Sequence, residues 1–523
     1  MKKRFLTLLT LGLVLALAAC GGGSAAENSP SGEAPAGSRT FTYAISGNPM
    51  STNPVVVNDR FGLTFANMVY SPLARLNAEG GMDFVLAETL DVSDDGLVMT
   101  VRLREGVKWS DGEPLTSQDV VFTYETRANP ENGNHTGLWI GGEQIAVHAV
   151  DDLTVEFHLP SVSAAALNNL LFEGFIMPYH VFGSEADFSV NDLQAHPVGT
   201  GPYVLVEYNR GQYLTFEANP HFFGGEVGIP QVNLRIIENA DTARLALQSG
   251  EVDAAIILPA DIGEIDYSQI TVFPFSENRV GYIGLNANSP EFQDVRVRQA
   301  VVYALNTHDM NLASFQSEEF FNTPNSFLPP RNPWASTNVN TFETNLDRAR
   351  ELLAEAGVEN LRLTFAFSAT DPVATSQATL AQAQLAQIGV TVDLDAGDGT
   401  VINSELRSGE NTSINLFVGG YIMGQDPDGY RSLFHSEGPA NFWTHHSAEI
   451  DRLFDEAAVE LDEEARFSLY EELQQVIAEY AIIVPVVDNL RVIAVNNRIG
   501  GVEAAGLVPI YTFDDWSKLT IVE

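Results

Sequence analysis

The sequence is poor in cysteine and in positive charge. A single cysteine, Cys20, occurs among 523 residues, which excludes an intramolecular disulfide and leaves the fold to its hydrophobic core. Lysine and arginine number 27 against 69 acidic residues, and the net charge is −42. We read this charge as a solubilising surface outside the cell. Because it repels the phosphate backbone, we expect no nucleic-acid partner.

Hydrophobic runs long enough to span a membrane are also missing after Cys20. Residues 5–19 form an uncharged apolar run behind three cations at residues 2–4. The run is too short to cross a bilayer comfortably and is typical of a signal peptide. The letters LAAC at residues 17–20 resemble a bacterial lipobox, which predicts cleavage before Cys20 and lipidation of its thiol. The alternative is an ordinary signal peptide with a chance cysteine.

Residues 21–40 contain no large apolar side chain and are rich in Gly, Ser, Ala and Pro, as in a flexible tether. We therefore predict a signal peptide over 1–19, then a lipidated cysteine and tether over 20–40. The body would be held in the cell envelope by its lipid, facing the periplasm or the cell exterior. It is long enough for more than one domain.

Signatures of catalysis and of cofactor binding are missing as well. The sequence has no Gly-x-Ser-x-Gly elbow, no His-Glu-x-x-His zinc helix and no Walker A motif. The stretch GTGPYV at 199–204 lacks the third glycine of a dinucleotide fingerprint, and Pro202 blocks the helix that should follow. We expect a binding protein without a cofactor. An exported hydrolase remains the alternative from another class.

The stretch GYIMGQDPDGYRSLFHSEG at 420–438 resembles a calcium loop only in part. Asp426, Asp428 and Glu437 occupy loop positions 1, 3 and 12, but Arg431 stands where a calcium loop requires glycine. We therefore predict no calcium site here.

Three histidines, His435, His445 and His446, could meet a transition metal. Adjacent side chains of an extended segment point to opposite faces, so one site using both His445 and His446 is disfavoured. We interpret them as surface or rim residues and predict no metal ligands.

Turn signals and hydrophobic periods predict a mixed α/β chain. The first half is rich in strands, with hairpins that turn at 151–152 and 209–211 and a capped helix after Thr116. Strand–helix–strand units follow at 232–257 and 361–394. The last predicted elements are a helix near 399–408, a strand at 414–418, helices at 448–461 and 464–479, and a returning strand at 481–488.

A chain that leaves one lobe, builds another and returns implies several crossings between lobes. Such crossings are suited to act as hinges, and the space between the lobes is suited to hold a ligand.

Five segments together resemble the bacterial solute-binding protein family 5, the dipeptide-, oligopeptide- and nickel-binding lipoproteins of ABC importers. They are LDVSDDGLVMTVRLREGVKWSDGEPLTSQDVVFTYE, HPVGTGPYVLVEYNRGQYLTFEANPHFFGG, FQDVRVRQAVVYALN, RARELLAEAG and EIDRLFDEAAVELDEEARFSLYEELQQVIAE. The resemblance covers nearly all of the chain after the tether, in order.

The resemblance implies an α/β fold of the periplasmic-binding-protein type II class, a two-lobed trap with an extra β-rich domain. The implied domains are domain I (41–54, 198–282 and 488–523), the β-rich domain II (55–197) and the closing lobe, domain III (283–487). The ligand would lie between domain I and domain III.

It also implies that residues 420–438 lie in the cleft. Many peptide-binding members carry Trp-x-x-Asp before an Asp-Pro, and that first aspartate meets the peptide ammonium. Here Tyr421 takes the tryptophan position, while Gly424 or Met423 takes that of the aspartate. The stretch is closer to a subgroup with Trp-x-x-Gly-x-Asp-Pro-Asp, also assigned to oligopeptides.

The candidate ligand-binding residues are Tyr421, Met423, Asp426 and Trp443. Asp426 either binds an ammonium group or caps a buried turn. Tyr421 and Trp443 either contact ligand or pack within a lobe.

The function that follows is capture of an oligopeptide, closure of the lobes and delivery to the permease subunits of the importer, by a monomer that makes and breaks no bond. A nickel chelate, an opine or an oligosaccharide is the alternative ligand in the same fold.

Overall fold

The computed structural model describes residues 39–522, except 58, 77–81, 133–135, 173, 184–196 and 341. The predicted signal peptide, Cys20 and all but the last residues of the predicted tether lie outside this range. Strand β1 (Thr40–Ile45) begins at the end of that tether. Within the described residues, no helix combines the length and the apolar character needed to cross a membrane.

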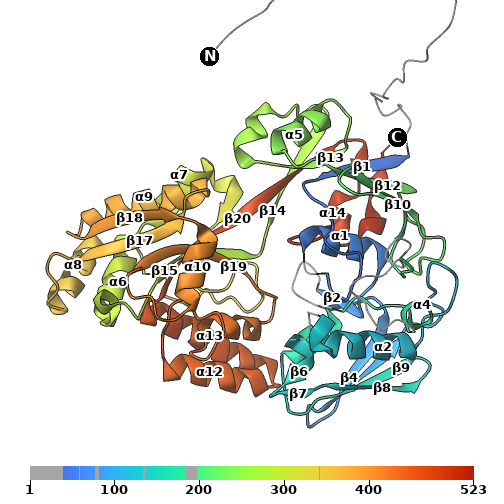
Figure 1. Ribbon diagram of the computed structural model, residues 1–523, viewed down its shortest axis with the longest axis horizontal. Coiled ribbons are helices and arrows are strands. Elements are labelled where there is room, and N and C mark those ends of the chain that lie inside the picture. The colour runs from blue at the N-terminus through green and yellow to red at the C-terminus, as the bar shows by residue number, and fades with distance from the viewer. Residues whose placement is uncertain are drawn as a thin grey trace, which may run out of the picture.

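A single twelve-stranded sheet runs through both main lobes (Figure 1). Its main path is β10 (Tyr203–Asn209), β11 (Tyr213–Ala218), β12 (Gln231–Ile236), β1, β13 (Ala254–Ile257), β20 (Ile483–Asn496), β15 (Arg279–Leu285), β19 (Leu416–Ile422), β17 (Arg362–Ser368) and β18 (Thr391–Gly397). Strands β14 (Ile270–Ser276) and β16 (Phe321–Asn322) also pair with β20. The mixed α/β class predicted from the sequence is confirmed.

The first lobe packs around β1, which lies between β12 and β13 and is parallel to both. Helix α5 (Ala240–Gln248) connects these two neighbours, as the strand–helix–strand prediction requires. Helix α1 (Arg60–Val69) shares one hydrophobic core with β1, since Phe65 and Met68 pack with Phe41 and Tyr43. The predicted domain II includes these residues, so the packing differs from that boundary at α1.

The β-rich domain carries a four-stranded antiparallel sheet in the order β4 (Ala87–Val92), β5 (Val98–Leu103), β9 (Thr154–His158) and β8 (Ala146–Asp151). Helix α2 (Ser117–Ala128) covers it and begins with the predicted capping box, in which the Thr116 N–H donates to Asp119 at 2.8 Å. The predicted hairpins at 151–152 and 209–211 are confirmed. Two short helices complete the domain, α3 (Ala166–Leu171) and α4 (Tyr179–Phe182).

The closing lobe has helices on both faces of its part of the sheet. Residues from α6 (Val295–Ala304), α7 (Thr307–Phe315), α8 (Leu346–Glu355) and α9 (Pro372–Ala386) form one hydrophobic core. A second core uses α11 (Arg431–Phe434), α12 (Ala448–Val459) and α13 (Glu463–Tyr480), with Leu406 of α10 (Gly399–Arg407). The predicted helices are confirmed, although α12 ends two residues early and leaves Leu461 exposed.

Strand β19 extends to Ile422, four residues beyond the end predicted at 418. The prediction stopped there because Gly419 and Gly420 signalled a loop. A Cβ atom on Gly419 would lie 2.4 Å from the Tyr282 hydroxyl, and one on Gly420 would lie 1.9 Å from an Arg279 nitrogen. The strand continues because both residues pair with β15, and the close approach of β15 side chains explains why glycine stands at these positions.

The remaining elements are short. They are β2 (Ala74–Leu76), β3 (Met82–Phe84), β6 (Trp139–Ile140), β7 (Glu143–Gln144), β21 (Ile499–Gly500), α14 (Val502–Ala505), β22 (Leu507–Val508), β23 (Thr512–Phe513) and β24 (Thr520–Ile521).

Two connections join the first lobe to the closing lobe: the turn between β14 and β15, and the strand β20. Asp488, fully buried in β20, ties them together. Its carboxylate accepts hydrogen bonds from the Ser276 hydroxyl at 2.8 Å and from the Asn322 amide at 3.0 Å. Burial raises the pKa of Asp488, and these hydrogen bonds partly offset the effect. The crossing is thus held by a network of buried polar groups.

Candidate functional site

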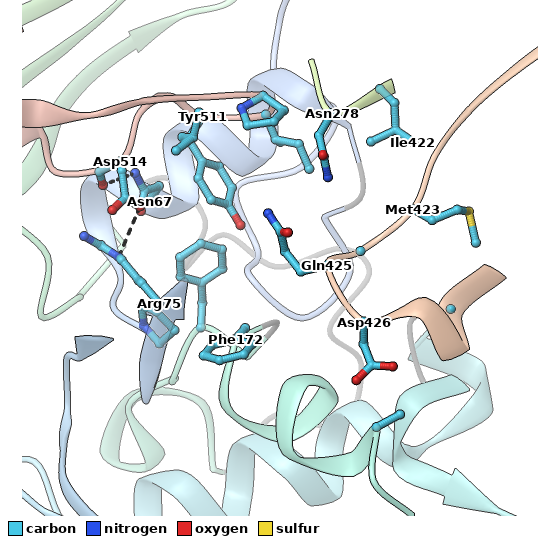
Figure 2. A pocket seen from close by; sticks show the side chains of 18 of the residues that line it. Asn67, Arg75, Phe172, Asn278, Ile422, Met423, Gln425, Asp426, Tyr511 and Asp514 are labelled. Atoms are coloured by element: carbon cyan, nitrogen blue, oxygen red, sulfur yellow. Dashed lines mark hydrogen bonds and ion pairs between the residues drawn. The ribbon is translucent and has the colours of Figure 1, made fainter. Parts of the chain in front are cut away.

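A cavity of about 390 Å³ lies where the first lobe, the β-rich domain and the closing lobe meet (Figure 2). Its apolar wall includes Phe172, Ile422, Met423 and Tyr511. Apolar walls with a few polar groups, at an interface between domains, are typical of ligand sites.

A second cavity of about 660 Å³ adjoins the first and shares Phe172, Gln425 and Asp426 with it. The β-rich domain contacts the closing lobe beside it. The Ala164 N–H donates to the Ala458 carbonyl at 2.9 Å, and Leu461 lies against Gly96. The two cavities together form a cleft that continues from the first lobe to this contact.

The segment that borders both cavities leaves the sheet where β19 ends. Ile422 pairs with Arg279 of β15, and residues 423–425 continue as coil along the first cavity. The Asn332 amide donates to the Gln425 carbonyl at 2.9 Å and fixes this coil. A short 3₁₀ helix, Pro427–Tyr430, then turns the chain away.

Asp426 begins that turn and is nearly fully buried. It accepts a hydrogen bond from the Asp428 N–H at 2.9 Å and two from the Arg466 guanidinium at 2.7 and 2.8 Å. Arg466 also lies over the Trp334 ring, 5.0 Å from its centroid. Of the two roles left open by the sequence, the geometry supports the turn-capping aspartate, because its charge is already neutralised by Arg466.

Tyr421 and Trp443 lie in the core of the closing lobe, away from the residues that line the cleft. The Tyr421 hydroxyl donates to the Phe327 carbonyl at 2.7 Å, and Trp443 stacks on Phe434 with ring centroids 4.5 Å apart. Since successive side chains of a strand face opposite sides, Ile422 faces the cavity where Tyr421 faces the core. The sequence interpretation chose the aromatic neighbour and missed Ile422. Of the four predicted residues, Met423 and Asp426 line the cavity, and their contact with ligand stays a prediction.

Four buried oxygen atoms around the cavity have no hydrogen-bond donor among the residues that the structure describes. They are Oδ1 of Asn67, Asn278 and Asp428, and Oε1 of Gln425. A buried acceptor without a donor costs free energy, about 1–3 kcal/mol. Nε of Arg75, which also lines the cavity, is a hydrogen-bond donor without an acceptor among the described residues, so unpaired acceptors outnumber it and the cavity is suited to a ligand that brings N–H groups.

Among these oxygens, only that of Asp428 belongs to a group that can carry charge. Burial raises the pKa of Asp428, and repulsion from Asp426 raises it further, while Arg431 and Arg466 lower it. Asp514 lies on another wall, 4.0 Å from Arg75, and burial raises its pKa too. The second aspartate of Asp-Pro-Asp was visible in the sequence but was considered only as a calcium ligand.

The three histidines differ in burial. The prediction of surface or rim residues is wrong for His435 and His445, which are buried, whereas His446 is exposed. Burial lowers the pKa of His445 to about 4, so it is neutral at pH 7. Within the described ranges, no group of three or more His, Cys, Asp or Glu side chains is arranged to hold a metal ion.

Comparison with known proteins identifies a family for this chain. The model of "Bacterial extracellular solute-binding proteins, family 5 Middle" matches residues 84–441, which is more than half of the sequence. The chain belongs to this family of solute-binding proteins. The resemblance inferred from the five motifs is therefore confirmed.

Individual relatives extend over almost the whole chain. Oligopeptide-binding protein AppA of Bacillus subtilis is 27% identical and covers 92% of this chain and 92% of its own length. Heme-binding protein A of Haemophilus influenzae is also 27% identical, over 95% of this chain and 96% of its own. The crystal structure of the ABC transporter substrate-binding protein CtaP from Listeria monocytogenes superposes with a TM-score of 0.88 at 33% identity, covering 92% of this chain and 99% of that one. The predicted type II binding-protein fold is thereby confirmed.

We expect the Asp426–Arg466 pair to be structurally indispensable. Replacing Asp426 by alanine leaves a buried guanidinium without its carboxylate, and should lower the free energy of unfolding by about 3–5 kcal/mol. Urea denaturation of the two proteins measures the difference.

The matched control is Asp393→Ala, which removes an exposed pair with Arg362 and should cost less than about 1 kcal/mol. Equal and small losses in both variants would contradict the structural role assigned to Asp426.

Proposed function

We propose that this solute-binding protein captures oligopeptides in the cleft between its lobes and delivers them to the permease of an ABC importer. The main support for a peptide ligand is the set of four unpaired acceptors in an apolar cavity, because a peptide supplies N–H donors along its whole length. The relatives support this assignment: one is named oligopeptide-binding protein AppA and another an ABC transporter substrate-binding protein.

The shape of the cleft supports an extended ligand. The first cavity continues into the second past Phe172, Gln425 and Asp426, so a ligand longer than one residue has room along a single path. Residues 423–425 run as coil beside it, directly after β19. Main-chain groups of such a segment can pair with an extended peptide whatever its side chains, as in β-strand addition.

The mechanism that we propose is closure around the ligand. Both main lobes and the β-rich domain contribute to the cleft walls, so a bound peptide gains most contacts when the lobes are together. Ligand binding then shifts the population toward the closed form, which fixes the relative position of the two surfaces that meet the permease. The protein acts as a monomer and makes or breaks no covalent bond.

A non-peptide solute is the second candidate. The Haemophilus influenzae relative, of equal identity, is named heme-binding protein A. A heme or another chelate would use the same apolar walls, which include Phe172 and Tyr511. A nickel chelate, an opine or an oligosaccharide belongs to the same class of alternative.

Native mass spectrometry on protein lacking residues 1–20, purified without refolding, tests the ligand class. We expect a spread of adducts with peptide masses that disappear on unfolding. A single sharp adduct that matches heme or another non-peptide solute would contradict the oligopeptide assignment. Incubating the protein with a defined peptide mixture should leave every peptide intact, and fragments that accumulate with time would favour the hydrolase instead.

We further propose that Asp428 receives the ammonium group of the peptide. An ammonium group has three N–H donors, and the Asp428 oxygen needs one. Its positive charge also offsets the cost of burying the negative charge of Asp428. Asp428→Asn should weaken binding of a peptide with a free amino group by at least about tenfold. N-acetylation of the same peptide should weaken binding to the unchanged protein similarly, but scarcely affect the variant. Calorimetric titration of both peptides with both proteins measures this coupling.

The pH dependence provides a check with a defined sign. The pKa of Asp428 is higher in the folded than in the unfolded protein, so the ionised carboxylate destabilises the fold at neutral pH. This destabilisation disappears as the pH falls through the folded pKa. Without ligand, Asp428→Asn should therefore raise Tm at pH 7 and leave it unchanged in acid. Affinity for the free-amine peptide should fall on acidification in the unchanged protein alone. Equal affinities of the two proteins for both peptides would exclude this role.

We also propose that Cys20 carries the membrane anchor. The support is the lipobox-like sequence LAAC at 17–20, ahead of a tether without large apolar residues. Cys20→Ser should abolish incorporation of radiolabelled palmitate and move the protein from the membrane fraction to the soluble fraction. Retention of label by the variant would overturn the proposal.

A further inference from the structure

A separate cavity of about 120 Å³ lies in the first lobe, on the far side of the segment 509–512 from the cleft. It is bordered by the carboxyl ends of β1, β12 and β13, through Ile45, Ile237 and Ile257. In open α/β sheets, ligands bind outside the carboxyl ends of parallel strands. The position alone therefore makes this cavity worth testing for a ligand.

Two arginines line it and share one carboxylate. Arg60 of α1 donates to Glu277 at 2.9 Å, and Arg491 of β20 approaches the same carboxylate oxygen at 3.6 Å. The Asn489 amide also donates to Glu277, at 3.2 Å. Glu277 thus compensates two cations with a single negative charge.

Arg491 has an N–H donor group without an acceptor. Its Nη1 atom is buried and has no hydrogen-bond partner in the described part of the chain, whereas Arg60 also donates to the Pro509 carbonyl. Burial lowers the pKa of Arg60, and repulsion from Arg491 lowers it further. A buried guanidinium nitrogen that lacks an acceptor is costly, and an anion in the cavity would supply that acceptor.

The hydroxyl groups at the cavity are largely engaged with the protein itself. Those of Tyr43 and Thr512 are hydrogen-bonded to each other at 3.1 Å, and the Thr64 hydroxyl donates to the Arg60 carbonyl at 2.9 Å. The acidic side chain that lines the cavity, Glu238, is exposed. The two arginines are therefore the main candidates to bind an anion here.

We propose that this cavity binds a small oxyanion, a phosphate, sulfate or carboxylate group, held by Arg491 and Arg60. The planar guanidinium matches the geometry of such groups, which accept two parallel hydrogen bonds from it. The site is distinct from the cleft, because Pro509 and Ile510 border the cleft while Thr512 borders the oxyanion cavity.

A bound oxyanion would contact the region where the chain crosses between the lobes. Arg60 belongs to the first lobe, whereas Glu277 lies in the turn between β14 and β15 and Arg491 lies in β20. An oxyanion held by both arginines would connect helix α1 of the first lobe to β20, one of the two chain segments that cross between the lobes. The proposal goes beyond peptide capture and does not depend on it.

Isothermal titration calorimetry with sodium phosphate and with sodium sulfate tests the site directly. The protein is the chain without residues 1–20, in chloride buffer of matched ionic strength. We expect saturable binding of one anion per molecule, weakened at least tenfold in Arg491→Gln. The control Arg362→Gln removes an equal charge from an exposed position and should leave binding unchanged. Absence of saturable binding of both anions, or equal binding by Arg491→Gln, would overturn the proposal.

Folding of the variant is checked separately. Arg491→Gln removes a cation that repels Arg60, so it should show an unchanged circular dichroism spectrum and a Tm in chloride that is not lowered. Arg491→Lys keeps the charge but loses the planar fork, so it should bind phosphate with intermediate affinity. If the glutamine variant fails to fold, the lysine variant decides, and unchanged phosphate affinity in that variant counts against the assignment.

A competition experiment distinguishes a peptide carboxylate from a free oxyanion as the bound group. Pentaalanine with a free carboxyl end and its carboxyl-amidated form are each added at millimolar concentration to phosphate-loaded protein. Displacement by the free-carboxyl form alone identifies the occupant as the carboxylate of a captured peptide. Displacement by neither form identifies a free oxyanion from solution. Displacement by both forms alike would overturn the requirement for a negative charge.

Discussion

The continuity of β20 is the constraint on which the rest of the structure depends. One end of this fourteen-residue strand completes the sheet of the closing lobe against β15, and the other end completes that of the first lobe against β13 and β14. Both lobes therefore share main-chain hydrogen bonds with the same strand. Asp488, near its middle, ties the strand to the second crossing through Ser276, so the relative path of the two crossings is set by buried polar contacts.

The chemistry of the cleft follows from an excess of acceptors over donors. Asp426 is satisfied by Arg466, whereas one side-chain oxygen in each of Asn67, Asn278, Gln425 and Asp428 has no donor among the residues that the structure describes. The small cavity beside it has the opposite character, because Arg60 and Arg491 compete for Glu277. Two neighbouring sites of opposite polarity are thus separated by the segment 509–512. Under the two proposals made above, each site would select its ligand by the groups that the protein leaves unpaired.

Much of the fold could be predicted from the sequence, because local signals agreed with it. The capping box at Thr116, the hairpin turns and the long amphipathic helices were all readable from spacing. The end of β19 was not, since the reason that Gly419 and Gly420 stay in a strand lies in β15, more than a hundred residues away. The packing of α1 with the first lobe was missed for the same reason.

The candidate site was predictable as a segment but not residue by residue. The family resemblance indicated residues 420–438, and Met423 and Asp426 do line the cavity. Tyr421 was chosen because it takes the tryptophan position of the family motif, but the register of β19 turns its side chain into the core. Asn67 and Asn278, which also line the cavity, come from distant parts of the chain, and no spacing rule could connect them to this segment.

The shared strand also has a consequence for how such proteins diversify. Residues of the first lobe lie before and after those of the closing lobe along the chain, and β20 belongs to both. An exchange of one continuous gene segment that ends inside β20 would replace half of a strand whose edges are already matched to two sheets. New ligand preferences are therefore more accessible through point changes along residues 422–429 and 508–514 than through the transplantation of a lobe.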